Sequence, residues 1–271
     1  MRRVLLHLGL HKTGTTVAQS FLYKNRQLIW PHFSLILPYK TRKTGLADIA
    51  TRHSVYRMNS TLAEFETGVR PLLDPIDFGT SRGLILSEEN FAGLRPSRNS
   101  AEGYGATPEL ATTLVEQVTD RLGPEPVDLT IYLALRQRED WMRSLWAHDL
   151  RRTRLVQDYD EFREALNHLP SPKETADMLQ DRLPLVKVQI EWMEDLRKRR
   201  FGPGAPFAAF LNLPRDKMFK LGAPEPHKPR PADEVLLELL ELNRSALDDA
   251  ALMAQKKALI KRAKDDLVSQ S

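Results

Sequence analysis

The chain has 271 residues, with 40 Lys and Arg against 36 Asp and Glu, a formal net charge of +4 and no cysteine. This length suffices for one large domain with a full hydrophobic core, and we expect a single domain over residues 1–271. The charge excess is too small to indicate a surface that coats nucleic acid. The absence of cysteine excludes a disulfide framework and a thiolate nucleophile, and it fits a cytoplasmic protein. With no run of about 18 apolar residues, no transmembrane helix is expected.

Three short apolar runs, at residues 4–10, 84–87 and 129–135, predict β-strands. Nearly continuous apolar runs suit the central strands of a parallel sheet, which are buried on both faces. Residues 107–122 have helical spacing, with Pro108 in the first turn and a Gly-Pro pair as the stop. Strands that alternate with helices indicate an α/β fold, here a three-layer sandwich around a central, mostly parallel sheet.

The C-terminal part has a different pattern. Residues 155–200 and 232–268 carry helical spacing without a convincing strand. We therefore expect residues 150–271 to form a mainly helical flank or cap of the same domain. The nearest candidate for a late strand is the stretch 207–213.

A stretch with two spaced glycines directly follows the first predicted strand. Gly9 and Gly14 are separated by four residues, which is the glycine spacing of the phosphate-binding loop GxxxxGK[ST]. The stretch also precedes a helical pattern over residues 17–22. Backbone N–H groups at the start of that helix, together with the hydroxyls of Thr15 and Thr16, can bind an anion. We predict a phosphate-binding loop here.

The lysine of this loop is displaced from its usual place. In a nucleoside-triphosphate site the lysine follows the second glycine, whereas here Thr15 follows Gly14 and the lysine is Lys12. This weakens the interpretation as a nucleotidase. Lys12 would reach the bound anion from the front of the loop, where it can neutralise charge that develops on a leaving oxygen without a metal ion. No metal site is expected in the chain.

The segment Lys12-Thr13-Gly14-Thr15-Thr16 resembles the loop of the sulfotransferase family, in which a first strand is followed by Lys-x-Gly-Thr-Thr. The wider phrase over residues 8–16 is similar to bacterial members of that family. The resemblance implies a P-loop-like fold and a nucleotide donor, 3'-phosphoadenylyl sulfate (PAPS). Its 5'-phosphosulfate would contact the loop residues His11, Lys12, Thr13, Gly14, Thr15 and Thr16.

A second segment carries the same resemblance. Residues 133–144 read as a strand that ends in Arg136, with Ser144 eight residues later, as in the family's 3'-phosphate site. An arginine at the carboxyl end of a parallel strand would lie at the sheet edge where open α/β sheets bind ligands. Taken alone, Arg136 fits a surface salt bridge with Glu139 or Asp140 equally well. Together with the loop, the segment indicates a guanidinium and a hydroxyl that converge on one phosphate.

Transfer to a hydroxyl requires a group that accepts its proton, and Glu88 and Glu89 follow the second predicted strand at the same edge. The resemblance supports a glutamate in this role, as in carbohydrate-acting members of the family. Strand alternation does not decide between the two, and Glu88 is slightly favoured. Both also suit the acidic first turn of a helix that starts at Ser87. His53 is the runner-up, because bacterial relatives often carry a histidine after the first helix.

Two further matches are weaker. The resemblance implies a basic loop over the 3'-phosphate, for which Lys228 and Arg230 are the candidates, although the family's glycine-containing signature is absent. Residues 79–83 spell the GxSxG of a hydrolase nucleophile elbow, but that elbow needs a strand before it. Here the predicted strand follows, so we interpret this match as accidental.

These features lead to one expected function, transfer of a sulfuryl group from PAPS to an acceptor hydroxyl. A carbohydrate or a glycolipid is the expected acceptor. A P-loop kinase of a small hydroxyl compound and a non-catalytic nucleotide-binding protein of the same fold are the alternatives. The sequence leaves the acceptor's identity and the oligomeric state open.

Overall fold

The computed structural model describes residues 1–96, 102–225 and 230–269. By its internal contacts the chain divides into two compact units. The first contains Met1–Gln137 and Leu169–Pro226, and the second contains Arg138–His168 and His227–Ser271. Residues 169–226, which lie in the C-terminal part of the sequence, thus belong to the first unit and not to the second.

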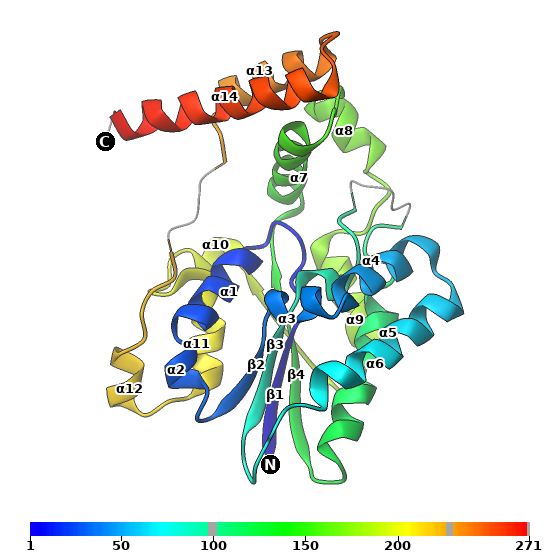
Figure 1. Ribbon diagram of the computed structural model, residues 1–271, viewed down its shortest axis with the longest axis vertical. Helices are drawn as coiled ribbons and strands as arrows, with labels where there is room; N and C mark the ends of the chain where they lie inside the picture. The colour runs from blue at the N-terminus through cyan, green and yellow to red at the C-terminus, as the bar shows by residue number, and fades with distance from the viewer. Residues whose placement is uncertain (97–101, 226–229, 270–271) are drawn as a thin grey trace. The chain divides into compact units, whose positions relative to one another are not determined.

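The first unit is built on a five-stranded parallel sheet (Figure 1). Its strand order is β2-β3-β1-β4-β5, with β1 in the centre. The register pairs Leu6 of β1 with Leu86 of β3 on one side and with Ile131 of β4 on the other. The bounds of the strands are β1 Arg2–His7, β2 Phe33–Ile36, β3 Gly83–Ser87, β4 Val127–Leu135 and β5 Lys187–Trp192.

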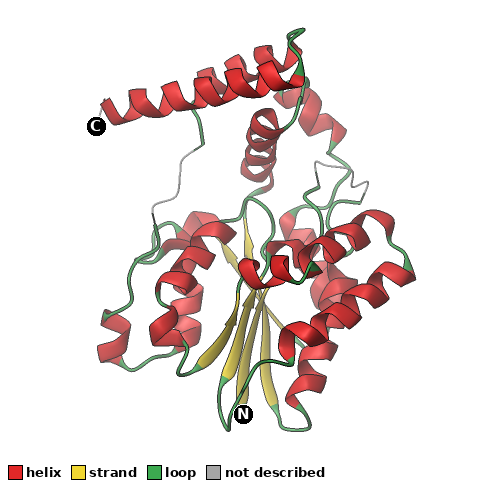
Figure 2. Cartoon of the chain, viewed as in Figure 1, coloured by secondary structure: helices red, strands yellow, loops and turns green. Residues whose placement is uncertain are grey.

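Helices cover both faces of this sheet, so the predicted three-layer α/β fold is confirmed (Figure 2). One face carries α1 Thr15–Lys24, α2 Arg26–Ile29, α10 Met193–Leu196 and α11 Ala205–Leu211. The other carries α4 Leu46–Tyr56, α5 Asn59–Leu73, α6 Thr107–Leu122 and α9 Pro172–Arg182. Shorter elements are α3 Pro38–Lys43, α12 Arg215–Phe219 and the 3₁₀ turns η1 Glu89–Ala92 and η2 Gly202–Gly204.

The core on the α1 face joins the central strands of the sheet to the helices that cover them. Leu5 and Tyr132 of the sheet belong to one buried cluster with Phe21 of α1 and Phe207 of α11. Each of these side chains is at most 2% exposed. Burial of large apolar side chains of this kind is the main driving force for folding, about 1.5–3 kcal/mol for each.

Three predicted strands and the predicted helix over 107–122 are confirmed, with one change of boundary. The first strand ends at His7 and not at residue 10. Leu8 and Leu10 are fully buried although they lie in the loop, which accounts for the longer apolar run in the sequence.

The sequence prediction missed β2 and β5. Strand β2 has only four residues, and β5 alternates polar and apolar side chains that are mostly half-buried, as expected for an edge strand. The stretch 207–213, the nearest candidate for a late strand, does not form one. Residues 205–211 form α11, with Pro206 in the first turn, where its missing N–H and fixed φ suit a helix start.

Within its described residues, the second unit contains helices and no strand. It consists of α7 Arg138–Arg152, α8 Tyr159–Ala165, α13 Asp233–Arg244 and α14 Asp249–Ser269. Buried polar groups join its helices: Asn243 Nδ2 donates to Leu155 O at 2.8 Å, and Lys256 Nζ donates to Thr153 O at 2.7 Å. Within the described residues, no helix combines the length and apolar character that crossing a membrane would need.

Candidate active site

The topology of the sheet marks one edge for ligand binding. The chain leaves β1 toward the α1 face on its way to β2, whereas the connections after β3 and β4 run over the opposite face. Neighbouring strands whose connections leave to opposite faces open a crevice at their carboxyl ends. The loop after β1, the residues after β3 and the residue after β4 therefore share one edge, as the sequence predicted.

The loop after β1 is shaped by its own side chains. Thr13 Oγ1 donates to Leu10 O at 2.7 Å, and Thr15 Oγ1 donates to the same oxygen at 3.3 Å. Gly14 is the N-cap of α1, with φ 86°. No side chain in the described part of the chain caps α1. The Val17 N–H donates to Gly14 O at 3.0 Å. A helix start of this kind, without a side-chain cap, is a place where backbone N–H groups and the helix dipole favour an anion.

The two glycines of the loop are required by close packing. A Cβ at Gly9 would lie 2.4 Å from Thr15 Oγ1, and a Cβ at Gly14 would lie 2.7 Å from Met193 Sδ. The spacing that suggested a phosphate-binding loop thus has a steric cause at both ends. Gly14 also needs its positive φ, which other residues adopt at a cost.

The side chain of Arg136 approaches the backbone of Lys12 at this loop. Lys12 is half-buried, and its backbone has φ 69°. Arg136, directly after β4, places Nη1 3.5 Å from the carbonyl oxygen of Lys12. Thr16 is exposed at the start of α1. The structure therefore brings together the loop and the arginine that the sequence assigned to it.

His11 is held by a residue that the sequence analysis missed. Its backbone N–H donates to the Tyr104 hydroxyl at 2.7 Å, and its Nδ1 lies 3.1 Å from the same oxygen. Burial, followed by the positive charges of Arg95 and Lys12, lowers the pKa of His11 well below its ordinary value of 6.5. His11 is therefore neutral at physiological pH and helps to shape the loop.

Glu88 is a buried residue with structural partners. Its side chain is fully buried. One carboxylate oxygen accepts a hydrogen bond from Thr41 Oγ1, and the other accepts from the Asn90 N–H at 3.1 Å as the N-cap of η1. The backbone N–H of Glu88 donates to His7 O at 3.1 Å. These bonds fix the chain where it leaves β3. Because both carboxylate oxygens already accept hydrogen bonds, Glu88 is poorly suited to accept a proton from a substrate.

Glu89 is the more accessible of the two carboxylates. It is half-buried, and burial, followed by the negative charge of Glu88, raises its pKa above the ordinary value of 4.5. The positive charges of Arg42 and Lys12 oppose this shift. A carboxylate with raised proton affinity at the same sheet edge as the loop lysine is suited to general base chemistry. The geometry thus favours Glu89 over Glu88, the reverse of the order preferred from the sequence.

Beneath the loop, His7 forms a buried polar link between three elements. Its Nδ1 is hydrogen-bonded to Ser87 Oγ at 2.7 Å, and Gln19 Nε2 of α1 donates to the same hydroxyl at 3.3 Å. Burial lowers the pKa of His7 to about 3, so the ring is neutral. The contacts tie β1, β3 and α1 together directly below the loop.

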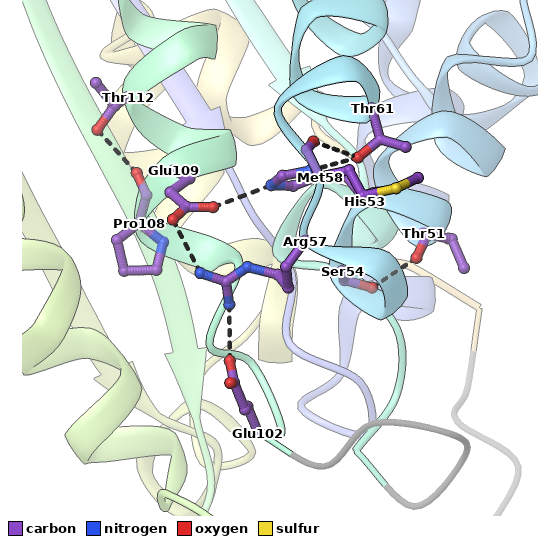
Figure 3. Close-up of polar contacts among 10 residues, drawn as sticks. All are labelled: Thr51, His53, Ser54, Arg57, Met58, Thr61, Glu102, Pro108, Glu109 and Thr112. Carbon is purple, nitrogen blue, oxygen red and sulfur yellow. Dashed lines mark hydrogen bonds and ion pairs between the residues drawn. The ribbon is translucent and has the colours of Figure 1, made fainter.

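His53 belongs to a separate polar group, here called the His53 cluster: His53, Arg57, Thr61 and Glu109 (Figure 3). His53 is 2% exposed. Its Nδ1 is hydrogen-bonded to Thr61 Oγ1 at 2.9 Å, and its Nε2 to Glu109 Oε2 at 3.0 Å. Arg57 Nη2 donates to the other oxygen of Glu109 at 2.9 Å. Because both ring nitrogens are engaged between α4, α5 and α6, we do not retain His53 as a base.

The remaining predicted residues lie in the second unit or outside the described residues. Ser144 is half-buried on α7, and Arg230 forms an ion pair with Asp233 at 3.1 Å. Both belong to the second unit, whereas Arg136 belongs to the first. Lys228 lies outside the described residues.

Residues 79–82 precede β3 and residue 83 begins it, in keeping with the interpretation of the GxSxG match as accidental. Their serine therefore does not lie on a strand-to-helix turn. Among residues 1–96, 102–225 and 230–269, no group of three or more His, Cys, Asp or Glu side chains is placed to hold a metal ion.

Comparison with known proteins gives only distant structural likenesses. No protein-family model matches the chain, and no curated protein matches it. Retinol dehydratase in complex with androsterone and the inactive cofactor PAP has 14% identity and a TM-score of 0.36, over 96% of this chain and 80% of that one. Its complex with retinol and PAP gives 15% and 0.35 over the same shares. The PezAT toxin–antitoxin system of Streptococcus pneumoniae gives 10% and 0.33, over 90% and 86%. Likenesses of this strength do not bear on the chemistry of this chain.

Proposed function

We propose that the chain is a sulfotransferase that moves a sulfuryl group from PAPS to an acceptor hydroxyl. The observation that carries this proposal is the pair of Lys12 and Glu89 at one sheet edge. Lys12 stands in front of Gly14, in a loop where a nucleotidase would carry its lysine after the glycine. Glu89 has a raised pKa and lies within the electrostatic reach of Lys12.

The donor would lie across the loop. Its 5'-phosphosulfate would accept hydrogen bonds from the first N–H groups of α1 and from the hydroxyls of Thr15 and Thr16, with Lys12 as counter-charge. Arg136 would contribute a guanidinium from the end of β4. In this proposal Arg136 contacts the 3'-phosphate of the donor.

The transfer step needs one base and one stabilised leaving group. Glu89 would accept the proton of the acceptor hydroxyl while the acceptor oxygen forms a bond to sulfur. The bond between sulfur and the bridging phosphate oxygen breaks, and the electron pair stays on that oxygen, where Lys12 would offset the charge. Positioning and charge neutralisation supply most of the rate, as in phosphoryl transfer.

The acceptor is proposed to be a hydroxyl of a carbohydrate or a glycolipid. The support is the glutamate base and the family resemblance of the loop. The localisation is proposed to be cytoplasmic on the lack of cysteine alone.

Thermal-shift measurements with adenosine 3',5'-bisphosphate, ADP and ATP with magnesium test the donor class. A ligand that binds only the native state at 100 times its Kd stabilises it by about 2.7 kcal/mol. We expect the bisphosphate to stabilise the chain most. Stabilisation by ATP with magnesium alone would support a kinase and contradict the proposal. Tight bisphosphate binding without transfer from PAPS to a broad panel of sugars would instead indicate a non-catalytic protein.

A further inference from the structure

Tyr104 makes a two-point contact with the phosphate-binding loop. Its side chain is 2% exposed. Its hydroxyl accepts the His11 N–H at 2.7 Å and lies 3.1 Å from His11 Nδ1. The two rings are nearly parallel, with an interplanar angle of 17° and centroids 6.2 Å apart. Burial raises the pKa of Tyr104, so its hydroxyl keeps its proton and can donate it to the neutral ring of His11.

The residue next to His11 needs such support. Lys12 has φ 69°, a left-handed conformation that costs free energy for any residue other than glycine. Two other non-glycine residues in the described part of the chain have a positive φ, Arg57 and Asn212. Both are C-caps of helices, where this conformation is common. Lys12 lies within a loop, so its conformation has to be imposed by its neighbours.

Tyr104 is itself anchored to the segment that carries the proposed base. Its carbonyl accepts the Thr107 N–H at 2.9 Å at the start of α6. Thr107 Oγ1 donates to Ala92 O at 2.7 Å, at the end of the η1 turn that Glu89 begins. Two hydrogen bonds thus lead from the turn of Glu89 to Tyr104, and a third leads from Tyr104 to the backbone beside Lys12.

We infer that Tyr104 is a positioning residue for the phosphate-binding loop, which holds the His11 backbone and so sets Lys12 in its anion-binding conformation at a fixed place relative to Glu89. The role of the loop in binding a nucleotide rests on the proposed function. The Tyr104 hydroxyl acts through His11 and does not touch the donor. Its loss should therefore weaken anion binding without removing any group that binds the anion.

The variant Tyr104→Phe tests this inference, because it removes the hydroxyl and keeps the buried ring. We expect the Kd for adenosine 3',5'-bisphosphate, measured by calorimetry, to rise roughly three- to tenfold, the effect of one or two hydrogen bonds. Hydrogen exchange of the His11 amide should become faster, which a role in packing alone would not cause. Unchanged affinity together with unchanged exchange would overturn the inference. Tyr23→Phe, at an exposed tyrosine of α1, is the matched control and should change neither.

Two further measurements keep the test decisive. His11→Ala removes the ring but keeps the backbone N–H, so it should weaken binding less than Tyr104→Phe; the opposite order would contradict the inference. In the parent protein, the His11 amide should be protected from exchange before any ligand is added, and free exchange would contradict the inference without any variant. If the parent binds ADP and not the bisphosphate, the proposed donor is wrong, and the same comparison with ADP still tests Tyr104.

Discussion

The phosphate-binding loop and the His53 cluster are both polar groups of the first unit, and the threonines of the loop and the histidine of the cluster are bonded in different ways. In the loop, Thr13 and Thr15 bond to a carbonyl three and five residues earlier, and no side chain among the described residues caps the helix that follows. In the cluster, His53 and Glu109 are 56 positions apart and come from different helices.

The difference separates two uses of polar side chains. Local bonds shape a loop while leaving backbone N–H groups oriented toward a ligand. In long-range bonds between helices, the donors and acceptors of the chain pair with one another, which favours stability. We therefore expect changes at the loop edge to alter turnover and changes in the cluster to alter stability.

The largest expected effect is that of Glu89→Gln. Loss of the general base should lower kcat about 10²- to 10⁴-fold, measured with saturating donor and acceptor. Because the pKa of Glu89 is raised by folding, its charged form opposes folding increasingly as the pH rises from 4.5 to the raised pKa, and by a constant amount above it. The variant should therefore melt no lower than the parent at pH 7. Glu88→Gln is the contrasting control, which should lower the melting temperature; a large kcat loss there with full activity in Glu89→Gln would reverse the assignment.

Lys12→Ala comes next in size. Removing the charge that is proposed to face the leaving oxygen should lower kcat/KM about 10²- to 10³-fold in a sulfate-transfer assay. Its melting temperature should stay close to that of the parent, since the side chain is only half-buried. Lys24→Ala, at the exposed end of the same loop-helix segment, should remain fully active. Substantial turnover by Lys12→Ala would remove the proposed role of the loop lysine.

The smallest effect is expected in the His53 cluster. Burial alone would raise the pKa of Glu109, but hydrogen bonds from His53 and Arg57 outweigh it and lower the pKa below 4.5. Its ionised form therefore stabilises the fold above that pH, and the contribution is lost as the pH falls through the lowered pKa.

Glu109→Gln should thus reduce the free energy of unfolding by about 1 kcal/mol at pH 7, because the pair is partly exposed. The difference from the parent, measured by urea unfolding, should shrink as the pH falls below 4.5. Turnover per folded molecule should not change. Glu116→Gln, at an exposed position of the same helix, should show no such pH dependence. A loss of turnover in Glu109→Gln would contradict the expectation that the cluster affects stability and the loop affects turnover.

The sequence could predict those parts of the site whose signals are local. The strand before the loop, its glycine spacing and the helix over 107–122 all depend on residues close in the chain, and the structure contains them. Strand β5 escaped prediction because Lys187, Gln189 and Glu191 give an edge strand the polarity of a surface helix.

The partners of the loop could not be predicted in the same way. The bond between Tyr104 and His11 spans 93 positions, and no pattern near either residue indicates it. Nearby residues also could not decide between Glu88 and Glu89, since the decision depends on the hydrogen bond from Thr41 to Glu88. Pairings of this kind are set by the tertiary fold and not by propensity or periodicity.

The contact between Gly14 and the residues beyond β5 has a consequence for how the molecule is made. The loop is synthesised early in translation. Met193 and Pro203, which pack against it, follow about 180 positions later. Strand β1 likewise cannot form its hydrogen bonds in the sheet until β3 and β4, which flank it, have been synthesised. Contacts this distant in sequence slow folding and leave apolar segments exposed during synthesis. The most recognisable motif of the chain is thus among the last to gain its final shape, and a fragment that ends before β5 would carry the motif without the support for it.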